Sequence, residues 1–383
     1  MKALKGKIVA QDDIVAGYLL LDGGKIAGVT PSAPDCEVLD CGDSFILPGF
    51  IDLHIHGVHE YLVDDGPEAL QGMCRTLPRY GVTGFLPTVS PSPAPHDAES
   101  LARLAATPTE GTQILGFHLE GPYRSLTGAF NQDAIQGAGE ARARALIAAA
   151  KPYKAIFSIA PDVEKIAEII PIMAADNTPV FMTHTAADVS QTLKAIEAGA
   201  CHATHFYDVF PCPPVSEPGV RPCGAVEAIL ADEDVSVDFI LDGVHVDPIA
   251  VKMALACKKH GRGRVCLITD AQVGAGNPPG TYIFGNMGQV HFDYPGSPAR
   301  LPDGALAGSG LTLDKALRNA VEWLGLDLVQ AGKMLSYNPA SVLHIEDRKG
   351  LLAAGYDADF VVLDSNLEVL STWIAGKEFY KKQ

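Results

Sequence analysis

Eight short apolar segments in the middle of the chain, each followed by a stretch with helical character, constrain the fold more than any other feature of the sequence. The intervening stretches are amphipathic or alanine-rich, for example ALIAAA, VSQTLKAIEAGA and PIAVKMALACKK. Regular alternation of strand and helix indicates a parallel sheet, and eight strands match a closed barrel. An open, doubly wound sheet would carry a glycine-rich phosphate loop after its first strand, and the sequence has no GxGxxG motif there. The predicted strands cover residues 50–57, 82–89, 114–121, 156–162, 180–185, 203–208, 236–246 and 264–271.

The two ends of the chain have a different pattern. Residues 2–30 alternate short apolar runs with turns, including an Asp22-Gly23 turn of the kind that joins hairpin strands, and the stretch after Gly350 is similar. Each end is too short to bury a core alone, but together they supply enough short strands for one small domain. We therefore predict an α/β fold: a (β/α)8 TIM barrel over residues 49–349, and a small β-sandwich domain built from residues 1–48 and 350–383.

The composition argues against several classes of partner. With 383 residues and a formal net charge of −17, the chain would repel nucleic acid and anionic membranes. The start, MKALKGKIVAQDD, lacks the apolar segment of a signal peptide, and no apolar run is long enough for a membrane span. The 8 cysteines include no CxxC pair and are expected to be reduced thiols. These features predict a cytoplasmic protein that acts on a small molecule.

Histidines and carboxylates gather at the ends of the predicted strands, where barrel active sites are built. His54 and His56 alternate along the first strand, so both imidazoles point to the same face and can supply two ligands to one metal ion. The alternative is a pair of hydrogen-bonded structural histidines. Four imidazoles and two carboxylates suit one or two Zn or Fe(II) ions, since Mg and Ca prefer oxygen ligands. The candidate ligands are His54, His56, Glu120, His184, His205 and Asp270.

Other residues of this region need separate interpretation. Asp270 is either a simple ligand or an acid–base group that takes a proton from an activated water and passes it to a leaving amine. His118 lies two residues before Glu120 and is interpreted as a supporting or packing histidine. Because no lysine stands at a predicted strand end, Glu120 is the candidate for a bridging ligand. The histidines outside the pattern are interpreted as structural or surface residues: His59, His96, His202, His260, His291 and His344.

Motifs along nearly the whole chain resemble one enzyme family. PGFIDLHIHG, HLEGPY, THT, ATHFYD, LDGVHVDP, LITDA and DGALAGSGLTLDKALRNAV occur in that order, followed by NPASVLHI and KGLLAAGYDADFVVLD. Together they are similar to the N-acetylglucosamine-6-phosphate deacetylase family of the amidohydrolase superfamily. HxH and TDA are shared by many amidohydrolases, whereas HLEGP, DGxHV and LAGS in this order are more specific.

The resemblance implies roles for particular residues. His54 and His56 would sit at one metal position, and Glu120, His184 and His205 would form the other, with Glu120 as the ligand that the two positions could share. Asp270 would be the catalytic acid–base at the amine that forms, and His245, in predicted strand 236–246, would contact the substrate. The loop from Asp303 to Ser309, which includes Leu306, would close over the acyl and sugar groups.

Three places that recognise substrate in the family differ in this chain. Tyr207-Asp208-Val209-Phe210 stands where the family usually has Asn-Ala-Met, Ser216 stands where it has an arginine, and Phe130 where it often has a histidine. A sugar phosphate favours arginine forks or clustered backbone N–H groups, and Asp208 would repel it. Arg124 and Arg221 could supply replacement charge, could hold a substrate carboxylate, or could be surface residues. The candidate substrate-binding residues are Asp208, Val209, His245, Phe130, Arg124, Arg221 and Leu306.

The resulting hypothesis is a metal-dependent hydrolase that removes the N-acetyl group from an amino sugar, either the 6-phosphate of N-acetylglucosamine or a related substrate. One or two divalent transition-metal ions are expected, zinc first and iron second, and the resemblance implies a homodimer. The alternatives are an amidohydrolase for an N-acyl amino acid or cyclic amide, and a non-catalytic barrel. A carboxylate-binding arginine at the pocket would favour the first alternative, and a missing ligand would favour the second.

Overall fold

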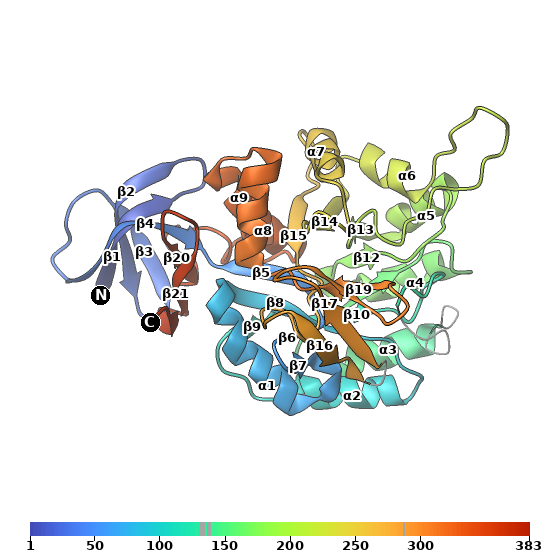
Figure 1. Ribbon diagram of the computed structural model, residues 1–383, viewed down its shortest axis with the longest axis horizontal. Helices are drawn as coiled ribbons and strands as arrows, with labels where there is room; N and C mark the ends of the chain where they lie inside the picture. The colour runs from blue at the N-terminus through green and yellow to red at the C-terminus, as the bar shows by residue number, and fades with distance from the viewer. Residues whose placement is uncertain (130–134, 136–138, 286–287) are drawn as a thin grey trace.

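The computed structural model describes residues 1–129, 135, 139–285 and 288–383. Its centre is a parallel barrel whose strand residues are buried, apart from the half-buried Cys201, because helices cover the outside and side chains fill the inside (Figure 1). Their order in the sheet is β15-β14-β13-β12-β11-β10-β8-β5, and a bridge between Ile55 and Ala271 joins the two end strands. The barrel strands are β5 (Phe50–Ile55), β8 (Val82–Val89), β10 (Phe117–Glu120), β11 (Ala155–Ile159), β12 (Val180–Met182), β13 (Ala200–Ala203), β14 (Ser236–Ile240) and β15 (Val265–Ile268).

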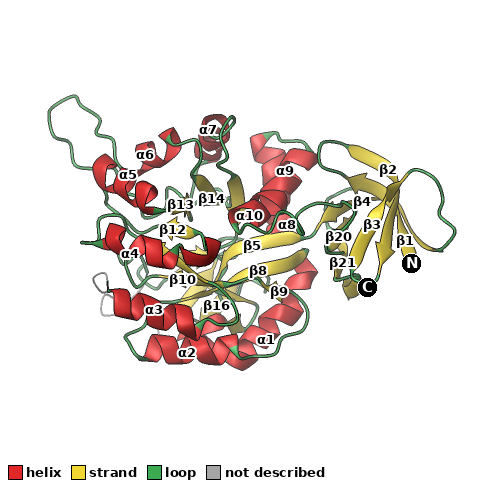
Figure 2. Ribbon diagram, turned by 180° about the vertical axis from the view of Figure 1, so that it is seen from behind, coloured by secondary structure: helices red, strands yellow, loops and turns green. Residues whose placement is uncertain are grey.

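Helices surround the barrel, as Figure 2 shows from behind. Local sequence fixes their ends: α5 begins at a capping box, in which Asp188 Oδ1 accepts from Gln191 N (2.8 Å) and Gln191 Oε1 accepts from Asp188 N (2.9 Å), and it ends at Gly199. The α-helices are α1 (Pro67–Thr76), α2 (His96–Ala105), α3 (Glu140–Ala149), α4 (Ile166–Met173), α5 (Val189–Ala198), α6 (Ala225–Ala231), α7 (Pro248–Cys257), α8 (Leu313–Asn319), α9 (Leu328–Leu335) and α10 (Tyr337–Val342). Among the described residues, no helix is long and apolar enough to cross a membrane.

Several strands end earlier than predicted. The sixth barrel strand was expected at 203–208 but occupies Ala200–Ala203, and the seventh ends at Ile240 rather than at residue 246. The predictions that His205 and His245 lie within strands were therefore wrong. The chain turns out of the sheet after Ala203, where His205, Tyr207 and Val209 have positive φ angles that a strand does not allow.

Both chain ends form one mixed sheet beside the barrel, at the left of Figure 1, and the two termini lie close to each other there. Hydrogen bonds connect all seven strands in the order β22-β21-β20-β4-β1-β2-β3, so the predicted sandwich is one continuous sheet around its own apolar cluster, which includes Leu4, Leu19, Phe360 and Trp373. These strands are β1 (Lys2–Val9), β2 (Ile14–Asp22), β3 (Lys25–Thr30), β4 (Glu37–Pro48), β20 (Phe360–Leu363), β21 (Val369–Ile374) and β22 (Lys377–Lys381).

A small antiparallel sheet follows the last barrel strand and was not predicted. Leu306–Ser309, expected in a loop, forms its edge strand β19, and the sheet packs on an apolar cluster that includes Phe284 and Phe292. Its other strands are β16 (Gly280–Ile283), β17 (Gln289–Phe292) and β18 (Pro298–Arg300).

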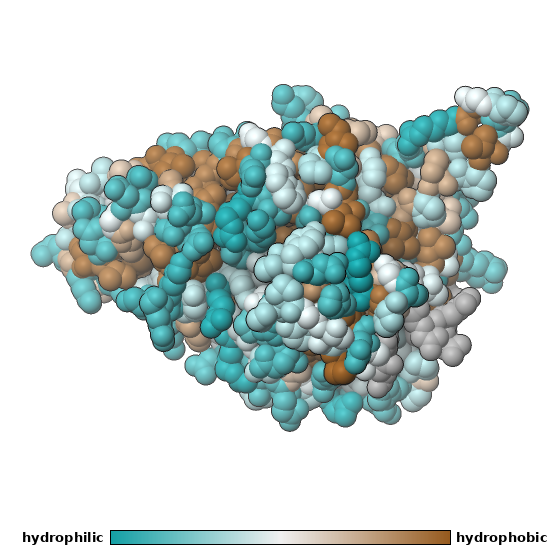
Figure 3. Space-filling view, viewed as in Figure 1, coloured by the Kyte–Doolittle hydropathy of each residue, from teal (hydrophilic) through white to brown (hydrophobic). Residues whose placement is uncertain are grey.

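Hydrophilic residues make up much of the visible face of the molecule, including the part over this sheet (Figure 3), as the net charge of −17 leads one to expect. Three short pieces lie elsewhere on the barrel: β6 (Gly57–Val58), β7 (Tyr61–Leu62) and β9 (Gln113–Ile114).

Candidate metal and active site

Five of the six predicted ligands form two overlapping groups at the carboxyl ends of the barrel strands. The ligand atoms of His54, His56 and Glu120 all lie within 4.8 Å of one another, and so do those of Glu120, His184 and His205. Glu120 belongs to both groups: Oε2 lies 3.1 Å from His56 Nε2, and Oε1 lies 2.8 Å from His184 Nε2. The five side chains are buried. The barrel thus brings together residues that are up to 151 positions apart, with Glu120 between the two groups.

Neighbouring polar groups fix the direction of the imidazoles. His54 Nδ1 lies 3.0 Å from Thr204 Oγ1, which leaves its Nε2 facing His56 Nε2 at 3.3 Å. His205 Nδ1 donates to the carbonyl of Asp208 (3.3 Å), and its Nε2 faces Glu120 Oε1 at the same distance. Such partners on the remote nitrogen set the tautomer and orientation of histidine ligands.

The backbone at these strand ends is strained. His184, His205 and Asp270 have φ angles of 45°, 35° and 45°, in the left-handed region that side chains other than glycine rarely adopt. Each of the three lies two residues after the last residue of a barrel strand. The positive φ turns the chain at that point, so that the side chain enters the mouth of the barrel and does not continue the alternation of the strand.

The electrostatics favour an ionised carboxylate in the centre of the cluster. Burial would raise the pKa of Glu120, but hydrogen bonds from four histidines lower it well below its usual range. Burial lowers the pKa of His184 to about 3. At His205, burial is outweighed by the hydrogen bond to Glu120 together with the charges of Glu120, Asp208 and Asp270, which raise the pKa to about 10. Glu120 is therefore the fixed negative charge around which the imidazoles gather.

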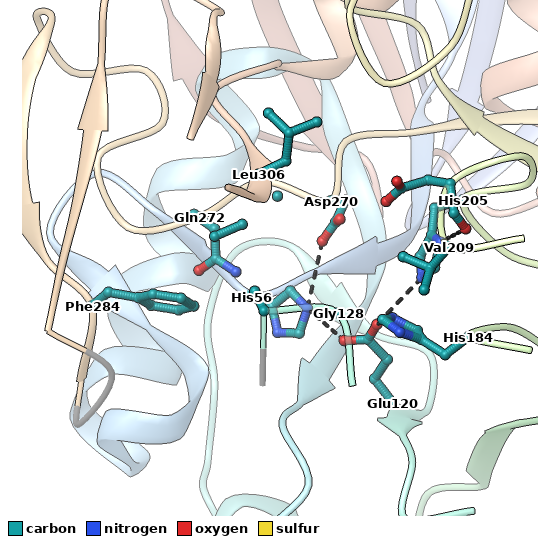
Figure 4. A pocket seen from close by; sticks show the side chains of 14 residues that line it. His56, Glu120, Gly128, His184, His205, Val209, Asp270, Gln272, Phe284 and Leu306 are labelled. Carbon is teal, nitrogen blue, oxygen red and sulfur yellow. Dashed lines mark hydrogen bonds and ion pairs between the residues drawn. The ribbon is translucent and has the colours of Figure 1, made fainter. Parts of the chain in front are cut away.

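Asp270 lies beside the first group and not within it. Its Oδ1 lies 3.5 Å from Nε2 of His54 and of His56, and Figure 4 shows its carboxylate pointing toward His56. Its backbone is held by neighbouring strands, since Asp270 N donates to His54 O and Ser309 N donates to Asp270 O. A carboxylate at this place can act as a ligand or exchange a proton with a molecule in the pocket.

A pocket opens above the cluster, and both polar and apolar residues line it. In Figure 4, Gln272, Phe284 and Leu306 lie on one side of it, and His184, His205 and Val209 on the other. The lining residues are His56, Glu120, Gly128, Ala129, His184, His205, Asp208, Val209, Asp270, Gln272, Phe284, Leu306, Ala307 and Gly308.

The structure separates the predicted substrate-binding residues. Asp208, Val209 and Leu306 line the pocket. Arg124 is 1% exposed, and its Nη1 lies 3.7 Å from Glu120 Oε1, so it is neither a surface residue nor a lining residue. Arg221 is outside the pocket lining: its side chain is 77% exposed and pairs with Glu227 at 2.9 Å. Phe130 lies outside the described residues.

His245 is held by a carboxylate three positions earlier. Its Nδ1 lies 2.7 Å from Asp242 Oδ2, and Asp242 Oδ1 accepts from the His245 backbone N–H at 2.9 Å. Burial would lower the pKa of His245, but the hydrogen bond to Asp242 and the charges of Asp242, Asp208 and Asp270 raise it. The Asp-Gly-Val-His sequence carries the signal for this contact, because it places Asp242 three positions before His245.

Other supporting residues were also missed. Asp238 accepts from His205 N at 2.6 Å through Oδ1, and its Oδ2 lies 2.7 Å from His202 Nε2, so one buried carboxylate anchors two elements. His118, interpreted from the sequence as a supporting or packing histidine, faces the carbonyl of Leu53 through Nδ1 and the hydroxyl of Ser158 through Nε2. Gln272 and Phe284 line the pocket and have no motif that would single them out.

The donor set fits a divalent transition metal. Four imidazole nitrogens and one ionised carboxylate converge in a buried place, which is the combination that suits zinc or ferrous ion and does not suit Mg or Ca. The sharing of Glu120 between the two groups would allow one ion or two.

Comparisons with known proteins agree with this architecture. The Amidohydrolase family model matches residues 45–211 and 297–379. The N-acetylgalactosamine-6-phosphate deacetylase of Escherichia coli O157:H7 is 33% identical, over 94% of this chain and 93% of that protein. The N-acetylglucosamine-6-phosphate deacetylase of Bacillus subtilis (strain 168) is 32% identical, over 96% and 94%.

Solved structures give the same result. The N-acetyl-D-glucosamine-6-phosphate deacetylase of Mycobacterium smegmatis is 26% identical with a TM-score of 0.89, over 99% of this chain and 100% of that one. The Pasteurella multocida N-acetylglucosamine-6-phosphate deacetylase is 25% identical with a TM-score of 0.88, and both chains are covered completely. The resemblance found in the motifs is thereby confirmed, and the chain belongs to the amidohydrolase family.

Proposed function

We propose that this protein is a metal-dependent deacetylase that hydrolyses the amide bond of an N-acetylated amino sugar. The observation that carries the proposal is the cluster of Glu120 with four histidines beside Asp270, at the floor of a pocket. The names of the relatives, which are deacetylases of amino sugar 6-phosphates, support the reaction and the class of substrate.

The proposed metal would be held by His54, His56, Glu120, His184 and His205, with zinc as the expected ion and iron as the second candidate. When bound, such an ion polarises a carbonyl group and makes water a better nucleophile at neutral pH. Metal analysis of the purified protein distinguishes zinc from iron and one ion from two.

Asp270 is the proposed acid–base residue. Hydrolysis of an amide removes a proton from the attacking water and adds one to the leaving nitrogen, so a single carboxylate between the two can carry it. Asp270 Oδ1 lies 3.5 Å from His54 Nε2 and His56 Nε2, and it lines the pocket. Gln272, Phe284 and Leu306 would contact the substrate from the side of the pocket that faces His184, His205 and Val209.

Asp270→Asn tests the proposal, because it keeps the shape of the side chain but removes the proton carrier. Turnover of N-acetylated amino sugars should fall by about 10²–10⁴-fold with the metal content retained. Asp43→Asn, at a fully exposed side chain, is the matched control and should behave as the wild type. Near-normal turnover in Asp270→Asn, or no deacetylation of any amino sugar by the wild type, would contradict the proposal.

A further inference from the structure

The pocket above the metal cluster is lined by acidic residues. Glu120, Asp208 and Asp270 contribute three carboxylates, and none of the described lining residues is a lysine or an arginine. The described lining therefore supplies no lysine or arginine to balance the charge of a phosphate.

The two arginines that could have balanced a phosphate are directed elsewhere. Arg124 is buried against Glu120, a residue of the metal cluster, and its charge offsets that carboxylate. Arg221 is exposed to solvent and pairs with Glu227. Neither guanidinium lines the pocket, so neither offers the two-pronged contact by which arginine holds phosphate.

Asp208 is fixed beside the cluster. Its carbonyl accepts a hydrogen bond from His205 Nδ1, and Val209, the next residue, also lines the pocket with a φ of 55°. The imidazole of His245 is hydrogen-bonded to Asp242. The negative charges of Asp208 and Asp270 also raise the pKa of His245, so this imidazole already interacts with three carboxylates. His245 Nε2 is buried and has no hydrogen-bond partner among the described residues, and His245 is not one of the residues that line the pocket.

We propose that the pocket takes an N-acyl amino sugar that carries no phosphate, and that Asp208 is the residue that discriminates against the 6-phosphate. The proposal rests on the proposed deacetylase function and narrows its substrate. A phosphate brings about 1.5 to 2 negative charges at pH 7, which would face Asp208 with no lysine or arginine in the described lining to balance them. A sugar hydroxyl, in contrast, can donate to the Asp208 carboxylate.

The experiment compares kcat/KM of the metal-loaded enzyme for N-acetylglucosamine and N-acetylgalactosamine, each with and without a 6-phosphate. The wild type should prefer the unphosphorylated form of the better sugar by about tenfold or more. A preference for the 6-phosphate would overturn this inference and leave the deacetylase function intact. Absence of turnover with all four sugars would instead count against the proposed function itself.

Asp208→Asn identifies the residue responsible, because it removes the charge and keeps the size of the side chain. The ratio of kcat/KM between the phosphorylated and unphosphorylated sugars should rise by about tenfold, mainly through a lower KM for the phosphate. Asp43→Asn removes an exposed carboxylate that is distant from Asp208 in the sequence, and it should leave this ratio of kcat/KM values unchanged. An unchanged ratio in Asp208→Asn, with turnover retained, would show that Asp208 does not discriminate.

Discussion

Single carboxylates decide the charge and direction of the histidines around this pocket. Asp242 bonds to His245, Glu120 contacts four imidazoles, and Asp238 holds His202 and the backbone of His205. Histidine can donate from either ring nitrogen, and the partner on one nitrogen determines which atom is left for chemistry. At this scale the site depends as much on the supporting carboxylates as on the predicted ligands.

Asp242→Asn should lower the pKa of His245. Burial alone disfavours the imidazolium, and the hydrogen bond and charge of Asp242 are the largest influences that raise the pKa above its usual value. Removing them lets burial dominate, so the protonated form of His245 should be lost at a lower pH than in the wild type. NMR titration of the His245 ring measures this directly, and an unchanged pKa would show that Asp242 does not control the charge.

The ends of the barrel strands carry the site, and their loops must let the ligands approach closely. Gly128, in the loop after β10, has a φ of 58°, and a Cβ built on it would lie 2.4 Å from His184 Cε1. Only glycine fits a positive φ next to a side chain at this distance. The loop and the ligand are therefore packed against each other.

Gly128→Ala should displace His184 or the loop. The left-handed backbone adds a cost of about 1–2 kcal/mol, and the contact adds to it. We expect lower metal content and lower turnover, with the far-UV circular dichroism spectrum retained. Gly139→Ala is the control, since a Cβ there meets no atom of the described residues within 4 Å. Full metal content and turnover in Gly128→Ala would refute the idea that this glycine is needed for the close contact between the loop and His184.

A buried ion-pair network connects the barrel to the mixed sheet of the chain ends. Lys349 is 4% exposed and pairs with Asp359 and with Asp357, the latter at 3.0 Å. Asp359 also accepts from Gln113, which precedes the third barrel strand, and from the backbone of Ala375. The network therefore contributes to the stability of the molecule as a whole.

Lys349→Ala should lower the free energy of unfolding by about 3–5 kcal/mol, because it leaves carboxylates buried without their cation. Urea denaturation measures the change. Lys5→Ala removes an exposed ion pair with Asp40 and should leave the midpoint close to that of the wild type, since exposed pairs contribute little. Equal midpoints for the two variants would show that the buried network is not stabilising.

Removal of the metal should lower the melting temperature of the protein. The proposed ligands come from four different strand ends, and an ion that binds only the folded state stabilises it by mass action. Dialysis against a chelator followed by a thermal scan tests this, and addition of zinc should restore the transition. If the chelated and zinc-loaded proteins melted together, the cluster would not be a metal site.

Three features were predictable from the amino-acid sequence alone: the barrel, the participation of both chain ends in a second sheet, and the set of residues that converge on Glu120. These features follow from local patterns, since strand–helix alternation and histidines at predicted strand ends can be recognised in the sequence without knowledge of the tertiary contacts. The domain boundaries, the roles of the site residues, the homodimer and the cytoplasmic location stay predictions.

Only the tertiary structure decided which residues the pocket uses. Arg124 turns inward to Glu120 and Arg221 pairs with Glu227 outside it, while Gln272 and Phe284 enter the lining from segments that carry no motif. His205 and His245 lie beyond their strands because the chain turns there. The physical reason is that the direction of a side chain depends on backbone angles and on partners far along the sequence, and neither is encoded in local apolar periodicity.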